Sequence, residues 1–138
     1  MNKFVNADPE VFESLAALSI DTPITMLNLI KLNGTAVYKD GTSCSGREAY
    51  ASYTHQIGPI FSRVGGKIVW SGSGEMTVVG PDNESWDLVF LAQYPSVQAF
   101  LDMIQDPEYL ASLKHRTAAV DTSRLICTRA NEDGGIYG

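Results

Sequence analysis

The chain has 138 residues, of which 44% are hydrophobic and 19% charged, a composition typical of one globular domain with a single core. Its formal net charge of −6 argues against binding to nucleic acid, which needs clustered lysine and arginine to displace counterions. The sequence has no run of about 18 apolar residues that could cross a membrane, and no apolar signal-peptide core at its start. We therefore expect a single-domain (residues 1–138), cytoplasmic protein whose partners include neither nucleic acid nor membrane.

A short N-terminal helix over residues 9–18 is the first element that the sequence predicts. Asp8 can accept a hydrogen bond from an amide at the helix start, and Pro9 is tolerated at the first helical position. The apolar, partly β-branched run 24–32 then predicts the first strand. The polar residues 33–45 contain two glycine turn signals, so we expect a loop there, one that could act as a lid.

A long helix is predicted to begin at Ser45, because Ser45-Gly46-Arg47-Glu48 fits a capping box. Pro59 should kink or restart this helix, since proline removes a backbone donor and clashes with the preceding turn. Gly65-Gly66 should end the helix, because glycine readily adopts the left-handed conformation of helix C-termini.

Three strands should follow this helix, separated by turns rich in glycine and serine: residues 67–72, 75–79 and 86–94. A second helical segment is predicted from Ser96, with a restart after Asp106-Pro107, where aspartate caps and proline takes the first position. The last strand should cover residues 123–129. The tail 130–138 has no periodicity and is expected to be flexible.

This order of elements predicts an α+β fold, a ferredoxin-like split βαβ sheet with its helices on one face and a core of about residues 24–129. The other face of the sheet would remain apolar and exposed, which is costly in a monomer. We therefore expect a homodimer formed through that face. To the uncovered face we assign Met26, Ile30, Ile68 and Trp70.

Several motifs resemble those of one protein family. They are Asn28, Ser45-Gly46-Arg47-Glu48-Ala49-Tyr50, Gly65-Gly66, Tyr94-Pro95-Ser96-Val97-Gln98-Ala99-Phe100, Asp106-Pro107-Glu108-Tyr109 and Lys114-His115-Arg116-Thr117-Ala118-Ala119. Together they resemble the DUF1330 family of small bacterial proteins in the dimeric α+β barrel superfamily. The resemblance implies a homodimer in which each protomer encloses a pocket.

Four side chains are candidates for ligand binding. Asn28 shares a strand face with apolar residues, so its amide either fixes a polar group of a ligand or bonds neighbouring backbone. Arg116 coincides with the arginine of the family's terminal motif; it either binds a carboxylate at two points or stabilises the end of its helix. Tyr53 and Trp70 could line a pocket or belong to the core.

Candidates for catalysis are weaker. Glu75 is the one carboxylate beside a predicted interior strand, where burial would suit it to proton transfer, although a glutamate at a turn is usually solvated. His115 stands near the end of the last helix and could transfer protons or serve the helix end. The sequence contains no GxGxxG, P-loop, GxSxG or HExxH motif, so we predict no cofactor.

Cysteine and histidine give little indication of a metal site. Cys44 stands in a polar segment and Cys127 in an apolar one, without CxxC spacing, which predicts free thiols in a reducing compartment. His55 and His115 are far apart and have no carboxylate at metal-ligand spacing. We predict no metal.

Two functions remain open at this point. One is a cofactor-independent enzyme, of the isomerase, cyclase, decarboxylase or monooxygenase type, acting on a small organic molecule in a pocket between sheet and helices. The other is a non-catalytic homodimer that binds a small ligand or another protein.

Overall fold

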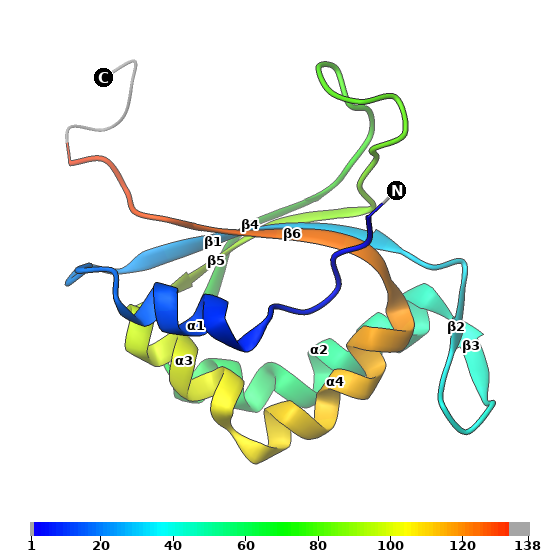
Figure 1. The fold of residues 1–138 in the computed structure, drawn as a ribbon, viewed down its shortest axis with the longest axis horizontal. Coiled ribbons are helices and arrows are strands. Elements are labelled where there is room, and N and C mark those ends of the chain that lie inside the picture. Colours follow the sequence, from blue (N-terminus) through cyan, green and yellow to red (C-terminus); the bar gives the residue numbers. More distant parts are fainter. Residues whose placement is uncertain (1, 133–138) are drawn as a thin grey trace.

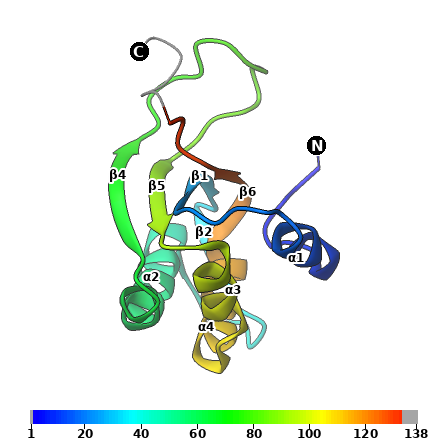
Figure 2. The ribbon, with the colours of Figure 1, turned by 90° about the vertical axis from the view of Figure 1, so that its left-hand side faces the viewer.

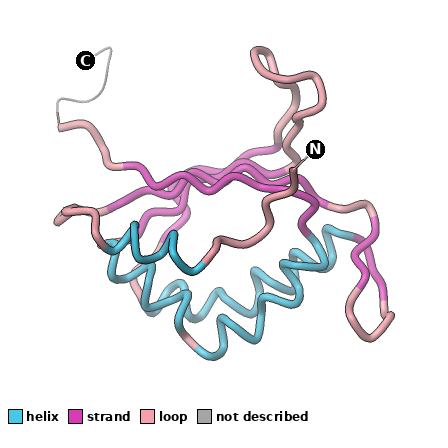
Figure 3. The backbone as a smooth tube through the Cα atoms, viewed as in Figure 1, coloured by secondary structure: helices cyan, strands magenta, loops and turns pink. Residues whose placement is uncertain are grey.

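The computed structural model describes residues 2–132, and its centre is an antiparallel sheet of four strands in the order β4-β5-β1-β6. The strands are β1 (Ile24–Leu32), β4 (Lys67–Ser73), β5 (Leu88–Tyr94) and β6 (Val120–Thr128). One face of the sheet is covered by helices α2 (Gly46–Arg63), α3 (Val97–Gln105) and α4 (Pro107–Ala119) (Figures 1 and 3). This is the predicted α+β, ferredoxin-like arrangement.

Strand β1 has the predicted bounds, and every second residue along it is buried. The buried set, which includes Met26, Asn28 and Ile30, therefore faces the helices. Met26 and Ile30 are 2% and 0% exposed, so their assignment to the uncovered face is wrong.

Helix α2 begins and ends as predicted. The Ser45 hydroxyl accepts a hydrogen bond of 3.0 Å from the Glu48 amide. At the other end Gly65 has φ +88°, and the amides of Gly65 and Gly66 donate to the carbonyls of Ser62 and Phe61, the pattern of a Schellman motif. The helix does not restart at Pro59, where the preceding Gly58 has no Cβ to clash with the proline ring.

The N-terminal helix α1 (Pro9–Ala16) is shorter than predicted, and the Asp8 side chain makes no capping bond to it. It packs beside α3 (Figure 2), with Phe12 and Leu15 against the core. The break between α3 and α4 falls at Asp106, as predicted. Within residues 2–132, no helix combines the length and hydropathy that crossing a membrane requires.

The segment 33–45 is not a simple loop. It contains a short antiparallel hairpin of β2 (Thr35–Val37) and β3 (Ser43–Ser45) that packs against α2 and α4. The turn is closed by a bond from the Tyr38 amide to the Thr42 carbonyl. Three-residue strands are too short for alternation to be recognised in the sequence, so this hairpin was missed.

The predicted strand 75–79 is also absent. Residues 74–87 instead form a loop that projects from the sheet on the side away from the helices (Figures 1 and 2). Met76, Val78 and Val79 are 81%, 83% and 93% exposed, and no neighbouring strand of this chain pairs with them in the part that the structure describes. Because the loop extends to residue 87, β5 begins at Leu88 rather than at residue 86. The last strand, β6, begins at Val120, directly after α4 and three residues earlier than predicted.

A β-bulge in β4 changes which face its side chains occupy. Ile68 pairs with Ala92, but Trp70 pairs with Leu91, so Val69 is an extra residue on β4. Trp70 therefore lies on the outer face, and the prediction that it shares the face of Ile68 is wrong. No periodic pattern reveals such an insertion.

The outer face of the sheet is apolar, as predicted. Of the four residues we assigned to it, Trp70 lies there, whereas Ile68, like Met26 and Ile30, is on the helix side, because Ile68 pairs with Ala92. The register places the following side chains on it: Leu27, Leu29, Trp70, Val89, Leu91 and Ile126. Trp70 and Ile126 are 54% and 48% exposed, and no helix covers this face in Figure 1.

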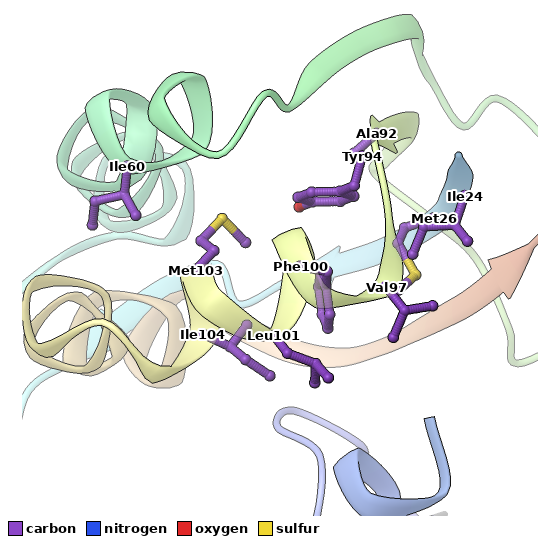
Figure 4. Packing of buried hydrophobic residues seen from close by; sticks show 10 residues of the cluster. All are labelled: Ile24, Met26, Ile60, Ala92, Tyr94, Val97, Phe100, Leu101, Met103 and Ile104. Carbon is purple, nitrogen blue, oxygen red and sulfur yellow. The ribbon is translucent and has the colours of Figure 1, made fainter. Parts of the chain in front are cut away.

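The core on the helix side consists of two clusters. One joins β1 and β5 to α2 and α3; Figure 4 shows ten of its residues, among them Met26, Tyr94 and Phe100. The other lies nearer α4 and includes Ile30, Tyr50 and Tyr53. Asn28 stands on β1 between Met26 and Ile30, at the boundary of the two clusters. Of the predicted tail, residues 133–138 lie outside the described residues.

Candidate functional site

A cavity of about 650 Å³ lies between the sheet and the helices. Its walls come from β1, β5, β6, the three covering helices and the N-terminal residues, and they are mostly apolar and aromatic. The polar side chains in its lining are Asn6, Asp8, Asn28, Tyr50, Tyr53, Thr54, Tyr94, Tyr109, Arg116 and Ser123. The structure thus brings three of the predicted ligand-binding residues, Asn28, Tyr53 and Arg116, to one cavity.

Asn28 is bonded on one side of its amide only. Its Nδ2 donates to the Met26 carbonyl at 3.1 Å, and no protein donor in the described chain bonds its Oδ1. Since no sealed side-chain oxygen or nitrogen lacks a partner among residues 2–132, this Oδ1 is reachable from solvent. The residue is 9% exposed. Asn28 therefore offers an acceptor to a molecule in the cavity it lines.

Tyrosines from two helices meet in the cavity. The hydroxyls of Tyr53 on α2 and Tyr109 on α4 are 3.0 Å apart, and the ring of Tyr50 packs 5.4 Å from that of Tyr53. Burial holds the pKa of Tyr53 well above its ordinary value, and burial likewise raises the pKa of Tyr50 and Tyr94. These phenols therefore stay protonated and act as hydrogen-bond donors.

Arg116 extends from the last turn of α4 toward these tyrosines. Its guanidinium carbon lies 5.7 Å from the centre of the Tyr53 ring, and its charge partly offsets the effect of burial on the pKa of Tyr50. Nε and Nη2 donate to the Val5 carbonyl at 3.2 and 3.1 Å, and Nη2 also donates to the Ser123 hydroxyl at 3.3 Å. No ion pair joins Arg116 to a carboxylate in the described chain.

Residues 3–8, here called the N-terminal strap, run along the cavity, and residues 4–8 form one of its walls. The strap lies between α4 and β6 (Figure 1), and the backbone of Phe4 bonds to β6: its amide donates to the Thr122 side-chain hydroxyl at 3.0 Å, and its carbonyl accepts from the Ser123 amide at 2.7 Å. Lys3 pairs with Asp121 at 2.6 Å. This wall was not predicted from the sequence, because the strap has no periodic pattern.

The remaining candidates lie away from the cavity. Trp70 is on the outer sheet face, and the exposed Glu75 belongs to the 74–87 loop rather than to an interior strand. His115 lines a second hollow, of about 740 Å³, between the β2–β3 hairpin and α4. There its Nδ1 is 2.7 Å from the Tyr38 hydroxyl and its Nε2 is 2.9 Å from Gln56 Nε2.

Neither cavity gathers a metal-binding set among the residues that the structure describes: no three histidine, cysteine, aspartate or glutamate side chains lie close enough to hold an ion. Cys44 and Cys127 are free thiols. Burial raises the pKa of the Cys127 thiol.

Sequence reasoning missed Tyr94, Tyr109 and Ser123 as parts of the cavity. Tyr94 and Ser123 reach it because β5 and β6 pair with β1 in the registers Ile24↔Tyr94 and Ile30↔Ser123. Strand pairing is the signal that would have identified them, since directly opposed residues share a face. Tyr109 follows the helix restart and lies one turn of α4 before Leu113, which also lines the cavity.

Comparison with known proteins places this fold in context. The crystal structure of the RPA0582 protein of unknown function from Rhodopseudomonas palustris is 46% identical, with a TM-score of 0.89 over 95% of this chain and 99% of that one. The crystal structure of the methylated RPA0582 protein has the same sequence identity of 46% and a TM-score of 0.93, over 98% of this chain and 100% of that one. SnoaB, a cofactor-independent oxygenase from Streptomyces nogalater, shares the fold at 17% identity, with a TM-score of 0.52 over 80% and 95%. No curated protein matches the chain.

The sequence model of the "Domain of unknown function (DUF1330)" matches residues 42–130, which include α2, the strands β4 to β6 and the helices α3 and α4. The resemblance seen in the short motifs is thereby confirmed over most of the cavity's walls. The chain belongs to the DUF1330 family.

Proposed function

We propose that the protein binds a small, largely apolar organic molecule in the cavity between its sheet and helices. The observation that carries this proposal is the cavity of about 650 Å³ itself, with the Asn28 amide and the Arg116 guanidinium in a lining that is mostly apolar and aromatic. Volumes of this order and a few placed polar groups are typical of small-molecule sites.

The polar groups suit a ligand with hydrogen-bonding atoms on part of its surface. Asn28 presents an acceptor and Arg116 presents donors, while the bonded pair of Tyr53 and Tyr109 hydroxyls has one O–H left to donate. The aromatic walls favour a planar, apolar body, because ring faces and edges pack well against other rings. Trp70 lies on the outer face of the sheet, so we propose that it contacts a partner chain rather than the ligand.

We further propose that the protein acts as a homodimer in which the outer sheet faces of two copies pack together. This face carries Leu27, Leu91 and Ile126, and Ile126 is 48% exposed in the single chain. Burial of such apolar surface contributes about 25 cal/mol per Å². A face-to-face contact would leave the cavity of each copy on the far side of its own sheet.

A cofactor-independent enzyme is the second candidate function. The observation that favours it is the group of neutral phenols beside an arginine, since donors fixed in a desolvated site stabilise a negative charge that develops on a substrate. The fold shared with SnoaB is compatible with such chemistry but is a likeness of fold alone. Without catalysis, the same cavity would make the protein a ligand-binding module.

The experiment that tests the proposed function has two parts. Native mass spectrometry of the freshly purified protein looks for a co-purified small molecule, and calorimetric titration with 2-naphthamide, a neutral two-ring probe, tests the cavity directly. We expect Asn28→Leu to weaken binding while the protein stays folded, because the amide makes one backbone bond, worth about 1 kcal/mol.

The matched control for Asn28→Leu is Thr25→Val. Thr25 lies on the same strand but on the opposite face, so this substitution should leave binding unchanged. The absence of any co-purified molecule, together with no binding of either 2-naphthamide or its carboxylate analogue 2-naphthoate, would reject the proposal. If Asn28→Leu unfolds the protein, the amide serves the backbone rather than a ligand.

A further inference from the structure

We infer that the cavity is specific for an anion, namely a monocarboxylate on an apolar aromatic body, and that Arg116 receives the carboxylate. This inference rests on the proposed function, because it names the class of ligand for the same cavity. It follows from the hydrogen bonds and the charge balance around Arg116.

The charge of Arg116 is not neutralised by the protein. The guanidinium lies in the cavity lining, beside the rings of Tyr50 and Tyr53, and its hydrogen bonds go to a carbonyl and a hydroxyl. Four other ion pairs form in the described chain, yet none includes Arg116. The cavity lining also contains the exposed carboxylate of Asp8, but Asp8 forms no ion pair with Arg116, so the half-buried guanidinium has no ion-pair partner among residues 2–132.

The dipole of helix α4 does not take the place of a negatively charged partner for Arg116. Arg116 stands in the last turn of α4, where the helix dipole favours a cation, but this dipole is equivalent to only about half of an elementary charge. The neighbouring phenols cannot compensate the charge either. Burial raises the pKa of Tyr50 and of Tyr53, so both side chains are neutral.

The guanidinium also has donors to spare. Nε and Nη2 donate to the Val5 carbonyl and the Ser123 hydroxyl, and the Tyr50 hydroxyl lies within reach of the guanidinium, whereas Nη1 makes no hydrogen bond of good geometry among residues 2–132. Because no sealed polar side-chain atom in this range lacks a partner, Nη1 is open to solvent. The strap and β6 therefore hold one edge of the planar guanidinium group in place and leave its other N–H donors for a ligand. The two oxygens of a carboxylate match the paired donors of a guanidinium better than a single oxygen does.

Asn28 lies close enough to contribute to the same ligand. It pairs with Leu125 across β1 and β6, which makes Ser123 its diagonal neighbour on the cavity side, and such neighbours are about 7–8 Å apart. Ser123 in turn bonds Arg116. A ligand of two fused rings spans a gap of this size, with its carboxylate at Arg116 and a hydrogen-bond donor, where it has one, at Asn28.

The test compares two probes of nearly the same shape, the anion 2-naphthoate and the neutral 2-naphthamide, by calorimetric titration of the 138-residue chain at pH 7.5 and low ionic strength. We expect the carboxylate to bind at least about tenfold more tightly than the amide, as charge-assisted hydrogen bonds require. Equal affinities would overturn the anion inference and leave the cavity proposal standing. Failure of both probes, with nothing co-purified, would reject the proposed function itself.

Variants then assign the preference to Arg116. In Arg116→Gln, the affinity for 2-naphthoate should fall to that for 2-naphthamide, which itself should change by less than about twofold. Arg47→Gln, which removes an exposed charge outside the cavity, should keep the full preference.

Arg116 also holds the strap, so the thermal unfolding of Arg116→Gln must be recorded. If this variant does not fold, Arg116→Lys replaces it: a lysine keeps the charge but lacks the fork, and the preference for 2-naphthoate should fall severalfold. An undiminished preference in a folded Arg116 variant would overturn the assignment.

Discussion

Asn28 is the only polar side chain on the helix-facing side of β1, and the sequence identified it because alternation along that strand is regular. Arg116 was identified by its motif. The hydrogen-bond partner of Arg116, the Val5 carbonyl, was not identified, because Val5 lies 111 residues away and belongs to a segment without periodicity. Residues within regular elements can thus be placed from the sequence, whereas a contact made by an irregular segment needs the fold.

His115 allows a test at the scale of a single residue. Partial burial, together with the charge of Lys114, lowers its pKa below the ordinary 6.5. The unfolded chain therefore binds the proton more readily, and the free energy of unfolding should decrease as the pH falls through about 6.5. Protonation also turns Nε2 into a donor facing the Gln56 amide nitrogen.

We expect His115→Gln to reduce the difference in unfolding free energy between pH 7.5 and pH 5.5, measured with urea. His55→Gln, at an exposed position on α2, is the matched control and should leave this difference as in the unmodified protein. An identical pH response in His115→Gln would show that His115 does not couple to folding.

Asp106 joins two helices; its cap on α4 was predicted from the sequence, whereas its ion pair with Arg63 was not. Its Oδ1 accepts a bond of 2.8 Å from the Glu108 amide and so caps α4, while its Oδ2 pairs with Arg63 of α2 at 2.7 Å. Asp106→Ala should lower the free energy of unfolding by about 1 kcal/mol through loss of the cap. Urea unfolding measures this difference.

Asp106→Asn separates the cap from the ion pair, because asparagine caps helices about as well as aspartate but carries no charge. Exposed ion pairs contribute about 0–1 kcal/mol, so this variant should lose much less stability than Asp106→Ala. Equal losses in the two variants would assign the effect to Arg63 and contradict the role of the cap.

The elements that were predicted well share strong local signals: alternation in β1, the Ser45 cap and Gly65 termination of α2, and the Asp106 restart. The errors have physical reasons as well. The bulge at Val69 moves Trp70 to the other face without altering composition, and the apolar run 75–79 has strand-like residues but no strand to pair with. Whether such a segment forms a strand, and which face its side chains occupy, depends on the neighbouring strand with which it pairs. That strand lies far away in the sequence, so the local pattern of residues does not reveal it.

At the scale of the molecule, the uncovered sheet face leads to a prediction about assembly. Light scattering at micromolar concentration should give twice the chain mass of 15.0 kDa. Ile126→Glu places a charge on the outer face and should shift the protein toward monomer, whereas Leu18→Glu, at a similarly exposed apolar position outside the sheet, should not. A mass of 15.0 kDa for the unmodified protein throughout this range would refute the dimer.

The guanidinium of Arg124 lies over two aromatic rings, 5.0 Å from the centre of Phe4 and 5.3 Å from that of Trp86. Phe4 belongs to the strap that walls the cavity, and Trp86 to the 74–87 loop that projects beyond the opposite side of the sheet. One side chain therefore connects the ligand site with the border of the proposed dimer interface. If this contact couples the two sites, thermodynamic linkage requires that a ligand changes the association constant of the dimer by the same factor by which dimerisation changes the affinity for the ligand. The apparent ligand affinity should then vary with protein concentration. The fluorescence emission of Trp86 should change together with the affinity.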